Sequence, residues 1–131
     1  MNQRNCETSN MANVIIADDA KFMRMMLRKI LEGEGHKVVA ECSSGKEVIS
    51  MYANLRPDFV TMDIVMPEPN GIEAVKSIRE FDPLAKIIMV TALGQEAMVV
   101  EALKAGASDF IIKPFKAGKV VQAVDKLIKK G

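Results

Sequence analysis

The sequence predicts one α/β domain, a five-stranded parallel sheet with helices on both of its faces. Short apolar runs alternate five times with longer amphipathic stretches, and strict alternation of this kind is typical of βαβ units. The connections between them are short, which favours right-handed crossovers between parallel strands. At 131 residues, the chain can bury one hydrophobic core but is too short for two.

The predicted strands are apolar runs separated by glycine, proline and charged residues. Two of them, Val14 to Ile16 and Ile87 to Val90, contain no alternating polar residues, so we expect central strands covered on both faces. The strands are predicted over residues 13–17, 37–42, 59–62, 86–91 and 109–112.

The amphipathic stretches between these runs are predicted as helices. Ser44 and Glu47, three residues apart, predict a capping box at the start of the second helix. In the first helix, Phe22 and Met25 fall outside the apolar stripe expected to face the core, so they either overlap the edge of the core or form a docking surface. That stripe consists of Met23, Met26, Leu27 and Ile30. The helices are predicted over residues 21–32, 45–54, 71–81, 95–105 and 116–130.

Composition excludes several classes of function. The chain carries 18 basic and 17 acidic residues and a net charge of +1, so no overall field attracts nucleic acid or anionic lipid. No apolar run approaches the ~18 to 20 residues that a membrane span needs. We therefore expect neither direct nucleic-acid binding nor membrane insertion.

The two cysteines indicate a reducing compartment. Cys6 and Cys42 lie far apart without metal-ligand spacing, which predicts free thiols and a cytoplasmic protein. His36 is the single histidine and follows a glycine, so we expect it on the surface. Residues 1–10 are polar and are predicted to form a mobile tail, which leaves residues 11–131 as the folded domain.

Polar residues follow four of the predicted strands. Asp18 and Asp19 follow the first, Asp63 the third, Thr91 ends the fourth, and Lys113 follows the fifth. Each alone has an ordinary structural explanation, as a helix cap or a solvated lysine. Because ligands of such sheets bind outside the carboxyl ends of the strands, the five together predict a functional site at that edge.

This set of residues is suited to metal-assisted phosphoryl chemistry. Three clustered carboxylates repel one another, and Lys113 supplies only one positive charge. Mg²⁺ would supply the other two, because it prefers oxygen ligands and is commonly held by carboxylates together with phosphate oxygens. A carboxylate beside such an ion can attack phosphorus and form an aspartyl phosphate. Lys113 and the Thr91 hydroxyl would then hold phosphoryl oxygens.

These residues stand in motifs that resemble the receiver domains of bacterial two-component systems, in particular stand-alone chemotaxis-type response regulators. The resemblance runs from about Asn13 to the C-terminus, with the motifs in the family's order and spacing. The matching stretches are Ile-Ala-Asp-Asp at 16–19, Met-Asp-Ile-Val-Met-Pro at 62–67 with Asn-Gly at 70–71, Val-Thr-Ala at 90–92 and Lys-Pro-Phe at 113–115.

The resemblance implies a role for each acidic residue. Asp63 would be the phosphoacceptor, taking a phosphoryl group from the phosphohistidine of a histidine kinase. Asp19 would bind Mg²⁺ directly and Asp18 largely through water, and the backbone carbonyl of Val65 would complete the protein ligands. The family fold is the flavodoxin-like sheet with strand order 2-1-3-4-5.

The resemblance also implies a switch. Thr91 and Lys113 would contact the phosphoryl group, and Thr91 would move toward it while Phe110 follows. Chemotaxis regulators often carry tyrosine where Phe110 stands, so the ring is kept but its hydroxyl is lost. The Lys113-Pro114 peptide would be cis, a conformation that is common only before proline.

With no output domain expected after the fifth helix, a monomeric signalling protein would act by docking to others. The implied partners are a histidine kinase, a downstream target such as the flagellar motor switch, and a phosphatase. The domain would be no enzyme, although it would assist its own phosphorylation and dephosphorylation. Val65 and Leu93 would flank the attacking water without orienting it, which predicts slow self-dephosphorylation.

Four alternatives stay open at this point. One is a phosphorelay intermediate that passes its phosphoryl group to another histidine. A haloacid-dehalogenase-type phosphatase would need an acid two residues after Asp63, where Val65 stands. A flavin-binding protein would need a hydroxyl-rich loop where Asp18 and Asp19 stand. The last is a metal-free interaction scaffold.

Overall fold

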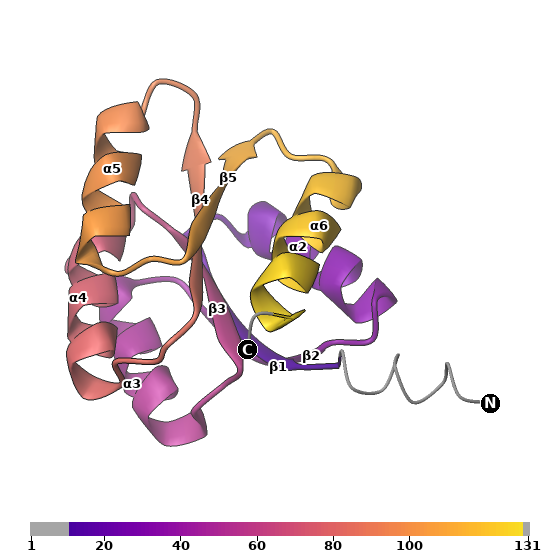
Figure 1. Ribbon diagram of the computed structural model, residues 1–131, viewed down its shortest axis with the longest axis horizontal. Helices are drawn as coiled ribbons and strands as arrows, with labels where there is room; N and C mark the ends of the chain where they lie inside the picture. Colours follow the sequence, from indigo (N-terminus) through magenta and orange to yellow (C-terminus); the bar gives the residue numbers. More distant parts are fainter. Residues whose placement is uncertain (1–10, 130–131) are drawn as a thin grey trace.

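The computed structural model describes residues 11–129. Within this range, five strands form one parallel sheet in the order β2-β1-β3-β4-β5. The helices lie in two layers, with α3, α4 and α5 on one face of the sheet and α2 and α6 on the other (Figure 1). The predicted α/β fold and strand order are therefore confirmed. The tail predicted over residues 1–10 lies outside the described residues.

The element bounds lie within two residues of the predicted ones. The strands are β1 Asn13–Ala17, β2 Lys37–Cys42, β3 Phe59–Asp63, β4 Ile87–Ala92 and β5 Asp109–Lys113. The helices are α2 Lys21–Gly33, α3 Gly45–Leu55, α4 Gly71–Phe81, α5 Glu96–Ala105 and α6 Ala117–Lys129. Pairing of Asp63 with Val90, and of Ala92 with Lys113, extends β3, β4 and β5 by one residue each beyond the prediction. Asp63 and Lys113 are consequently the last residues of their strands.

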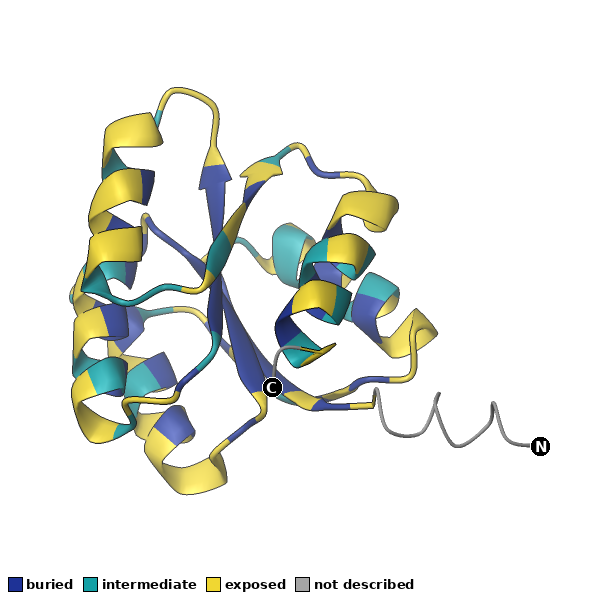
Figure 2. Ribbon diagram, viewed as in Figure 1, coloured by how far each residue is buried: buried dark blue, intermediate teal, exposed yellow. Residues whose placement is uncertain are grey.

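The hydrophobic core lies in two layers, one on each side of the sheet. β3 is buried along its whole length at the centre (Figure 2). Its Val60 and Met62 face the layer under α3, α4 and α5, whereas Phe59 faces the layer under α2 and α6. Coverage on both faces explains why the central strands are continuous apolar runs.

The apolar stripe predicted on α2 packs against the sheet. Met23, Met26 and Ile30 are partly buried against the core, and Leu27 is fully buried. Phe22 and Met25, expected on another face, are exposed.

The capping box predicted for α3 is only half formed. The Ser44 hydroxyl accepts a hydrogen bond from the Glu47 backbone N–H, as expected. The Glu47 carboxylate, however, accepts from the backbone and hydroxyl of Ser43, one residue before the N-cap. A complete capping box occurs instead at the start of α4, between Asn70 and Glu73.

The expectation of a surface position for His36 was wrong. Its side chain is buried and packs edge-on against Phe59, with the ring centroids 5.8 Å apart. Nδ1 accepts a hydrogen bond of 3.1 Å from the Ala12 backbone N–H. The pairing of β1 with β2 begins where the Lys37 N–H donates to the Ala12 carbonyl. This hydrogen bond places His36, the residue before Lys37, next to Ala12.

Candidate functional site

Three carboxylates converge at the carboxyl ends of two neighbouring strands. Asp18 and Asp19 follow β1, and Asp63 ends β3, which pairs with β1. One oxygen from each carboxylate lies within 4.8 Å of the other two. Asp18 and Asp63 are 1% and 7% exposed, whereas Asp19 is exposed. The parallel register thus assembles an acidic cluster in which Asp18 and Asp63 are buried and Asp19 is exposed.

Lys113 reaches this cluster from the edge strand β5. Its Nζ lies 3.2 Å from Asp18 Oδ2 and 3.2 Å from Asp63 Oδ2. Burial lowers the pKa of Lys113, but the charges of Asp63 and Asp18 outweigh it and leave that pKa raised. The lysine is therefore a paired cation within the site, and a role as a solvated surface lysine is excluded.

One ammonium does not balance the cluster. Burial raises the pKa of Asp63, and the negative charge of Asp18 raises it further. Lys113 and the Val65 backbone N–H, which lies 3.4 Å from Asp63 Oδ1, act in the opposite direction without cancelling the rise. Ionised Asp63 is thus held against an unfavourable field that additional positive charge would relieve.

The oxygens available at the cluster fit a hard divalent cation. Asp18 Oδ1 accepts a hydrogen bond of 2.8 Å from the Ala20 N–H. Asp18 Oδ2 is buried and, among the described residues, has no hydrogen-bond partner apart from its ion pair with Lys113. A carboxylate oxygen with this single cationic partner keeps a lone pair that a metal ion can use. In proteins, Mg²⁺ is typically bound by carboxylate oxygens. Asp18, Asp19 and Asp63 place such oxygens close together and could therefore hold this ion.

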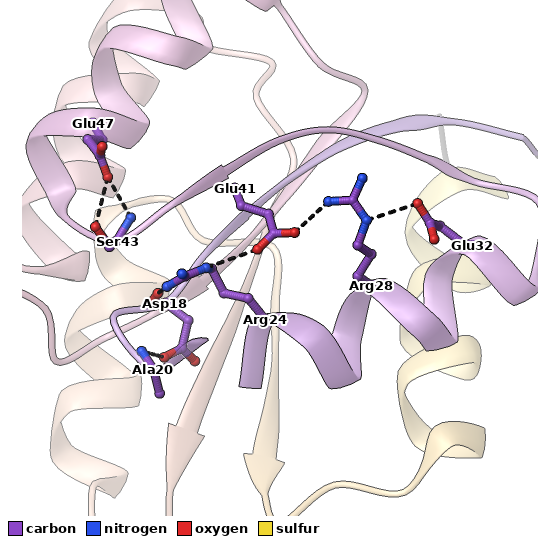
Figure 3. A network of polar contacts seen from close by, with 8 residues as sticks. All are labelled: Asp18, Ala20, Arg24, Arg28, Glu32, Glu41, Ser43 and Glu47. Atoms are coloured by element: carbon purple, nitrogen blue, oxygen red, sulfur yellow. Dashed lines mark hydrogen bonds and ion pairs between the residues drawn. The ribbon is translucent and has the colours of Figure 1, made fainter. Parts of the chain in front are cut away.

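A polar network behind the cluster fixes the β1–α2 loop, and sequence reasoning missed it. The Arg24 guanidinium donates to the Asp18 backbone carbonyl, and its Nε lies 3.0 Å from Glu41 Oε1 (Figure 3). Arg28 pairs with the same glutamate and continues the network to Glu32. The N-cap of α2 is Ala20, which makes no side-chain capping bond within the described chain. The aspartates are therefore not explained as caps of this helix.

Thr91 is present at the site with its hydroxyl already engaged. Its side chain is buried, and Oγ1 donates to Gln95 Oε1 over 2.7 Å. The Ala92 backbone N–H donates to the same oxygen over 2.9 Å. Thr91 does not cap α5, whose N-cap is Gln95. Nothing in the sequence pattern had indicated Gln95.

Phe110 lies on β5 and is 38% exposed. Its ring borders an apolar cavity of about 230 Å³ between β4, β5 and α5. The other lining residues are Thr91, Ala92, Glu96, Val99, Val100, Leu103 and Ile112. Free volume therefore lies between Thr91 and Phe110. Val65 and Leu93, at the loops after β3 and β4, are 51% and 71% exposed.

A doubly wound sheet with an acidic cluster at β1 and β3, a hydroxyl at β4 and a lysine at β5 defines a receiver-type domain. The Response regulator receiver domain family matches residues 14–125, and the chain belongs to this family. The expected cis peptide between Lys113 and Pro114 is present, and a second one precedes Pro69.

Similar proteins narrow the class further. The chain is 55% identical to the chemotaxis protein CheY of Thermotoga maritima over 116 residues, covering 88% of this chain and 97% of that protein. It is 50% identical to CheY of Bacillus subtilis, covering 88% and 96%. The chain is accordingly a receiver domain of chemotaxis signalling, and the phosphorelay alternative is not favoured.

Solved structures agree with this assignment. The response regulator domain of Thermotoga maritima CheB matches with a TM-score of 0.84 and 37% identity, over 91% of this chain and 97% of that one. CheY in a CheX-CheY-BeF3-Mg²⁺ complex from Borrelia burgdorferi matches with a TM-score of 0.83 and 40% identity, over 87% of each chain. Between residues 11 and 129, no helix is long and apolar enough to cross a membrane.

Proposed function

We propose that Asp63 accepts a phosphoryl group from a phosphohistidine and that the resulting aspartyl phosphate is the signalling state. The observation that carries this proposal is the position of Asp63. Its carboxylate is nearly buried at the end of β3, with Lys113 Nζ 3.2 Å away and two further aspartates beside it. A nucleophile placed so close to a cation and a metal-binding cluster is arranged to attack an anionic phosphoryl group.

The transfer forms one bond and breaks one. A lone pair of the Asp63 carboxylate forms the new oxygen–phosphorus bond, while the phosphorus–nitrogen bond of the donor breaks. The leaving imidazole nitrogen keeps that electron pair and takes a proton from solvent. The Lys113 ammonium, already at the Asp63 oxygen, compensates charge on the phosphoryl oxygens.

Asp18, Asp19, Asp63 and the backbone carbonyl of Val65 are the proposed Mg²⁺ ligands. When bound, the ion supplies positive charge that offsets the clustered carboxylates and the incoming phosphoryl group. Asp18 and Asp63 hold their oxygens in place by burial. Exposed Asp19 is the carboxylate most open to a hydrated ion.

We also propose the partners of this cycle. A histidine kinase would supply the phosphoryl group, a phosphatase would remove it, and a target such as the flagellar motor switch would read it. The CheX-CheY-BeF3-Mg²⁺ complex of the Borrelia burgdorferi relative supports a protein partner that binds a domain of this kind. Residues 11–131 would act as one monomeric cytoplasmic unit, promoting its own phosphorylation and dephosphorylation.

Labelling with acetyl phosphate tests the acceptor. In this reaction acetate is the leaving group, so no kinase is needed. With Mg²⁺ present, mass spectrometry of the intact protein should show one added phosphoryl group, absent from Asp63→Asn. Asp58→Asn is the matched control, because Asp58 lies just before β3 at its opposite end and accepts from the Asn13 N–H. Full labelling of Asp63→Asn would refute the assignment.

Calorimetric titration with Mg²⁺ tests the ligand set. Removing a unit charge in contact with a divalent ion changes the binding energy by more than ~1 kcal/mol, so Asp19→Asn should weaken binding by about tenfold or more. Asp19 is exposed, so this substitution should leave folding intact. Equal Mg²⁺ affinities of Asp19→Asn and Asp58→Asn would remove Asp19 from the site.

The proposed response is an inward movement of Thr91 followed by Phe110. The cavity beside both side chains supplies the space. Amide chemical shifts of α5, β5 and α6 should therefore change on phosphorylation, because packed elements rearrange between discrete states. Changes confined to the loop after Asp63 would contradict this coupling.

A further inference from the structure

We infer that Gln95 is a positioning residue that holds the Thr91 hydroxyl in its unphosphorylated place and so sets how readily the switch responds. This inference rests on the proposed function, because it concerns the step in which Thr91 turns toward the phosphoryl group. Its basis is a pair of hydrogen bonds that end on one side-chain oxygen.

Gln95 Oε1 accepts from Thr91 Oγ1 at 2.7 Å and from the Ala92 N–H at 2.9 Å. The backbone N–H can only donate, so the oxygen of the amide, and not its nitrogen, must face β4. The two bonds join the end of β4 to the first residue before α5. They form a closed link across the β4–α5 loop.

The local structure shows that this link replaces a more usual interaction. Gln95 is the N-cap of α5, and an N-cap side chain normally accepts from a backbone N–H of its own first turn. In the described part of the chain, Gln95 makes no such bond with α5. Its side chain turns back toward β4 instead. The N-cap side chain of α5 therefore bonds to Thr91 and does not cap the first turn of the helix.

The link competes directly with phosphoryl binding. A hydroxyl has one proton, so Thr91 Oγ1 cannot donate to Gln95 and to a phosphoryl oxygen at the same time. A net hydrogen bond of ordinary strength corresponds to about threefold to tenfold in an equilibrium constant. The Gln95 bond should therefore oppose activation by a factor of this size.

Breaking the link between Thr91 and Gln95 also couples the phosphorylation site to the exposed surface of α5. Once the Thr91 hydroxyl leaves, Gln95 loses one of its two bonds, and the start of α5 is held to β4 by the Ala92 N–H alone. Val100 and Leu103 of this helix line the same cavity as Phe110 and are exposed. Movement of one hydroxyl is thus coupled to an apolar face of α5 without requiring a phenolic hydrogen bond at Phe110.

Titration with beryllofluoride in excess Mg²⁺ tests the inference, since this anion occupies the place of a phosphoryl group on a carboxylate. Gln95→Met keeps the side-chain length and removes the acceptor. Its affinity for beryllofluoride should be about threefold to tenfold higher than that of the wild type. Gln122→Met is the matched control, because Gln122 is exposed on α6, and its affinity should equal that of the wild type. Equal affinities of the wild type and Gln95→Met would overturn the inference.

A double-mutant cycle separates the proposed competition from a merely structural effect. In Thr91→Val, which has no hydroxyl, adding Gln95→Met should leave the affinity unchanged. An equal gain with and without the Thr91 hydroxyl would overturn the inference.

A third measurement needs neither phosphorylation nor its mimic. In the free protein, Gln95→Met should speed hydrogen exchange of the Ala92 amide, since the substitution removes its acceptor. Unchanged Ala92 exchange would overturn the inference whatever the ligand does. By contrast, a wild type that binds no beryllofluoride and is not labelled at Asp63 would refute the proposed function and leave the exchange test of the link in force.

Discussion

β3, which ends at Asp63, and β5, which ends at Lys113, differ sharply in their surroundings. β3 is paired on both sides and buried at all five positions. β5 is an edge strand that pairs with β4 alone, and only Ile111 of its residues is buried. The proposed acceptor, Asp63, lies on β3, whereas Phe110 and Lys113 lie on β5. The carboxylate is thus held by a buried, doubly paired strand, whereas the Phe110 ring lies on an edge strand that is paired on one side only.

The surface next to β5 fits this division. A groove of about 710 Å³ runs between β5 and α6, with Phe110, Ile112 and Leu93 beside several lysines. A chemical change at a buried strand can reach a partner only through elements that are exposed themselves. If the comparison holds, substitutions around β3 should alter stability strongly, and those near β5 should alter signalling with little effect on folding.

The largest effect is expected at Gly71, at the start of α4. A Cβ there would overlap the backbone oxygen of Asp63 and lie 2.8 Å from the Cα of Ile64. Backbone cannot yield as a flexible side chain does, so Gly71→Ala should lower the free energy of unfolding by about 3 kcal/mol. Urea denaturation would measure this loss.

Gly118 provides the matched control, since a Cβ there meets no described atom within 4 Å. Gly118→Ala lies in α6 beside β5 and should raise stability by about 0.5–1 kcal/mol, because alanine loses less entropy in a helix. Equal destabilisation by the two substitutions would remove the contrast between the strands.

The second prediction concerns the lifetime of the phosphoryl group. Val65 and Leu93, two residues after Asp63 and Thr91, are exposed, and neither can orient an attacking water. Val65→Asn and Leu93→Glu should each speed decay of the labelled protein, by about tenfold, because an aligned water reacts faster. Decay would be followed with Mg²⁺ present and no partner. If all three proteins decay alike, access at these positions does not limit hydrolysis.

The sequence predicted most of this comparison, and what it missed has a common physical cause. Strand-end residues such as Asp63 and Lys113 were predictable because parallel pairing brings strand ends to one edge whatever the side-chain conformations. The bonds of Gln95 and Arg24 depend on where long polar side chains turn after the backbone is in place. No periodicity reports that choice.

The error at His36 has the same origin. A glycine before it suggested a loop, but burial was decided by the pairing of β1 with β2 and by contact with Phe59. Likewise, Glu47 was expected to bond the N-cap of α3 and instead bonds Ser43. Element boundaries follow from local pattern, whereas the partners of individual polar side chains follow from tertiary packing.

The third prediction tests how tightly the centre of β3 is packed. Thr61 is fully buried, and among the described residues its hydroxyl has no hydrogen-bond partner. Valine has nearly the same shape without that unsatisfied group, so Thr61→Val should stabilise the protein by about 1 kcal/mol. Thr61→Ser keeps the hydroxyl and removes a methyl, and should destabilise it. A loss of stability in Thr61→Val would mean that the hydroxyl finds a partner.

The smallest effect is expected from His36, at the end of the sheet opposite the acceptor. Burial lowers the pKa of His36, and the nearby charges of Asp125 and Glu34 do not cancel this. The unfolded chain therefore binds a proton more readily than the folded one, and stability should fall as the pH drops below the ordinary value of about 6.5.

The hydrogen bond of His36 leads to the same expectation. Nδ1 accepts from the Ala12 N–H, and protonation would remove that acceptor from a buried place. His36→Asn keeps an acceptor and cannot titrate, so it is the reference for the pH profile. Between pH 7.5 and 6, wild type should lose stability relative to His36→Asn, by less than about 1 kcal/mol because the unfolded-state pKa limits the effect. Chemical denaturation across this range measures the difference, and parallel profiles would contradict the prediction. Beryllofluoride affinity should stay the same in the two proteins at pH 7.5, because His36 precedes β2 at the end of the sheet opposite Asp63.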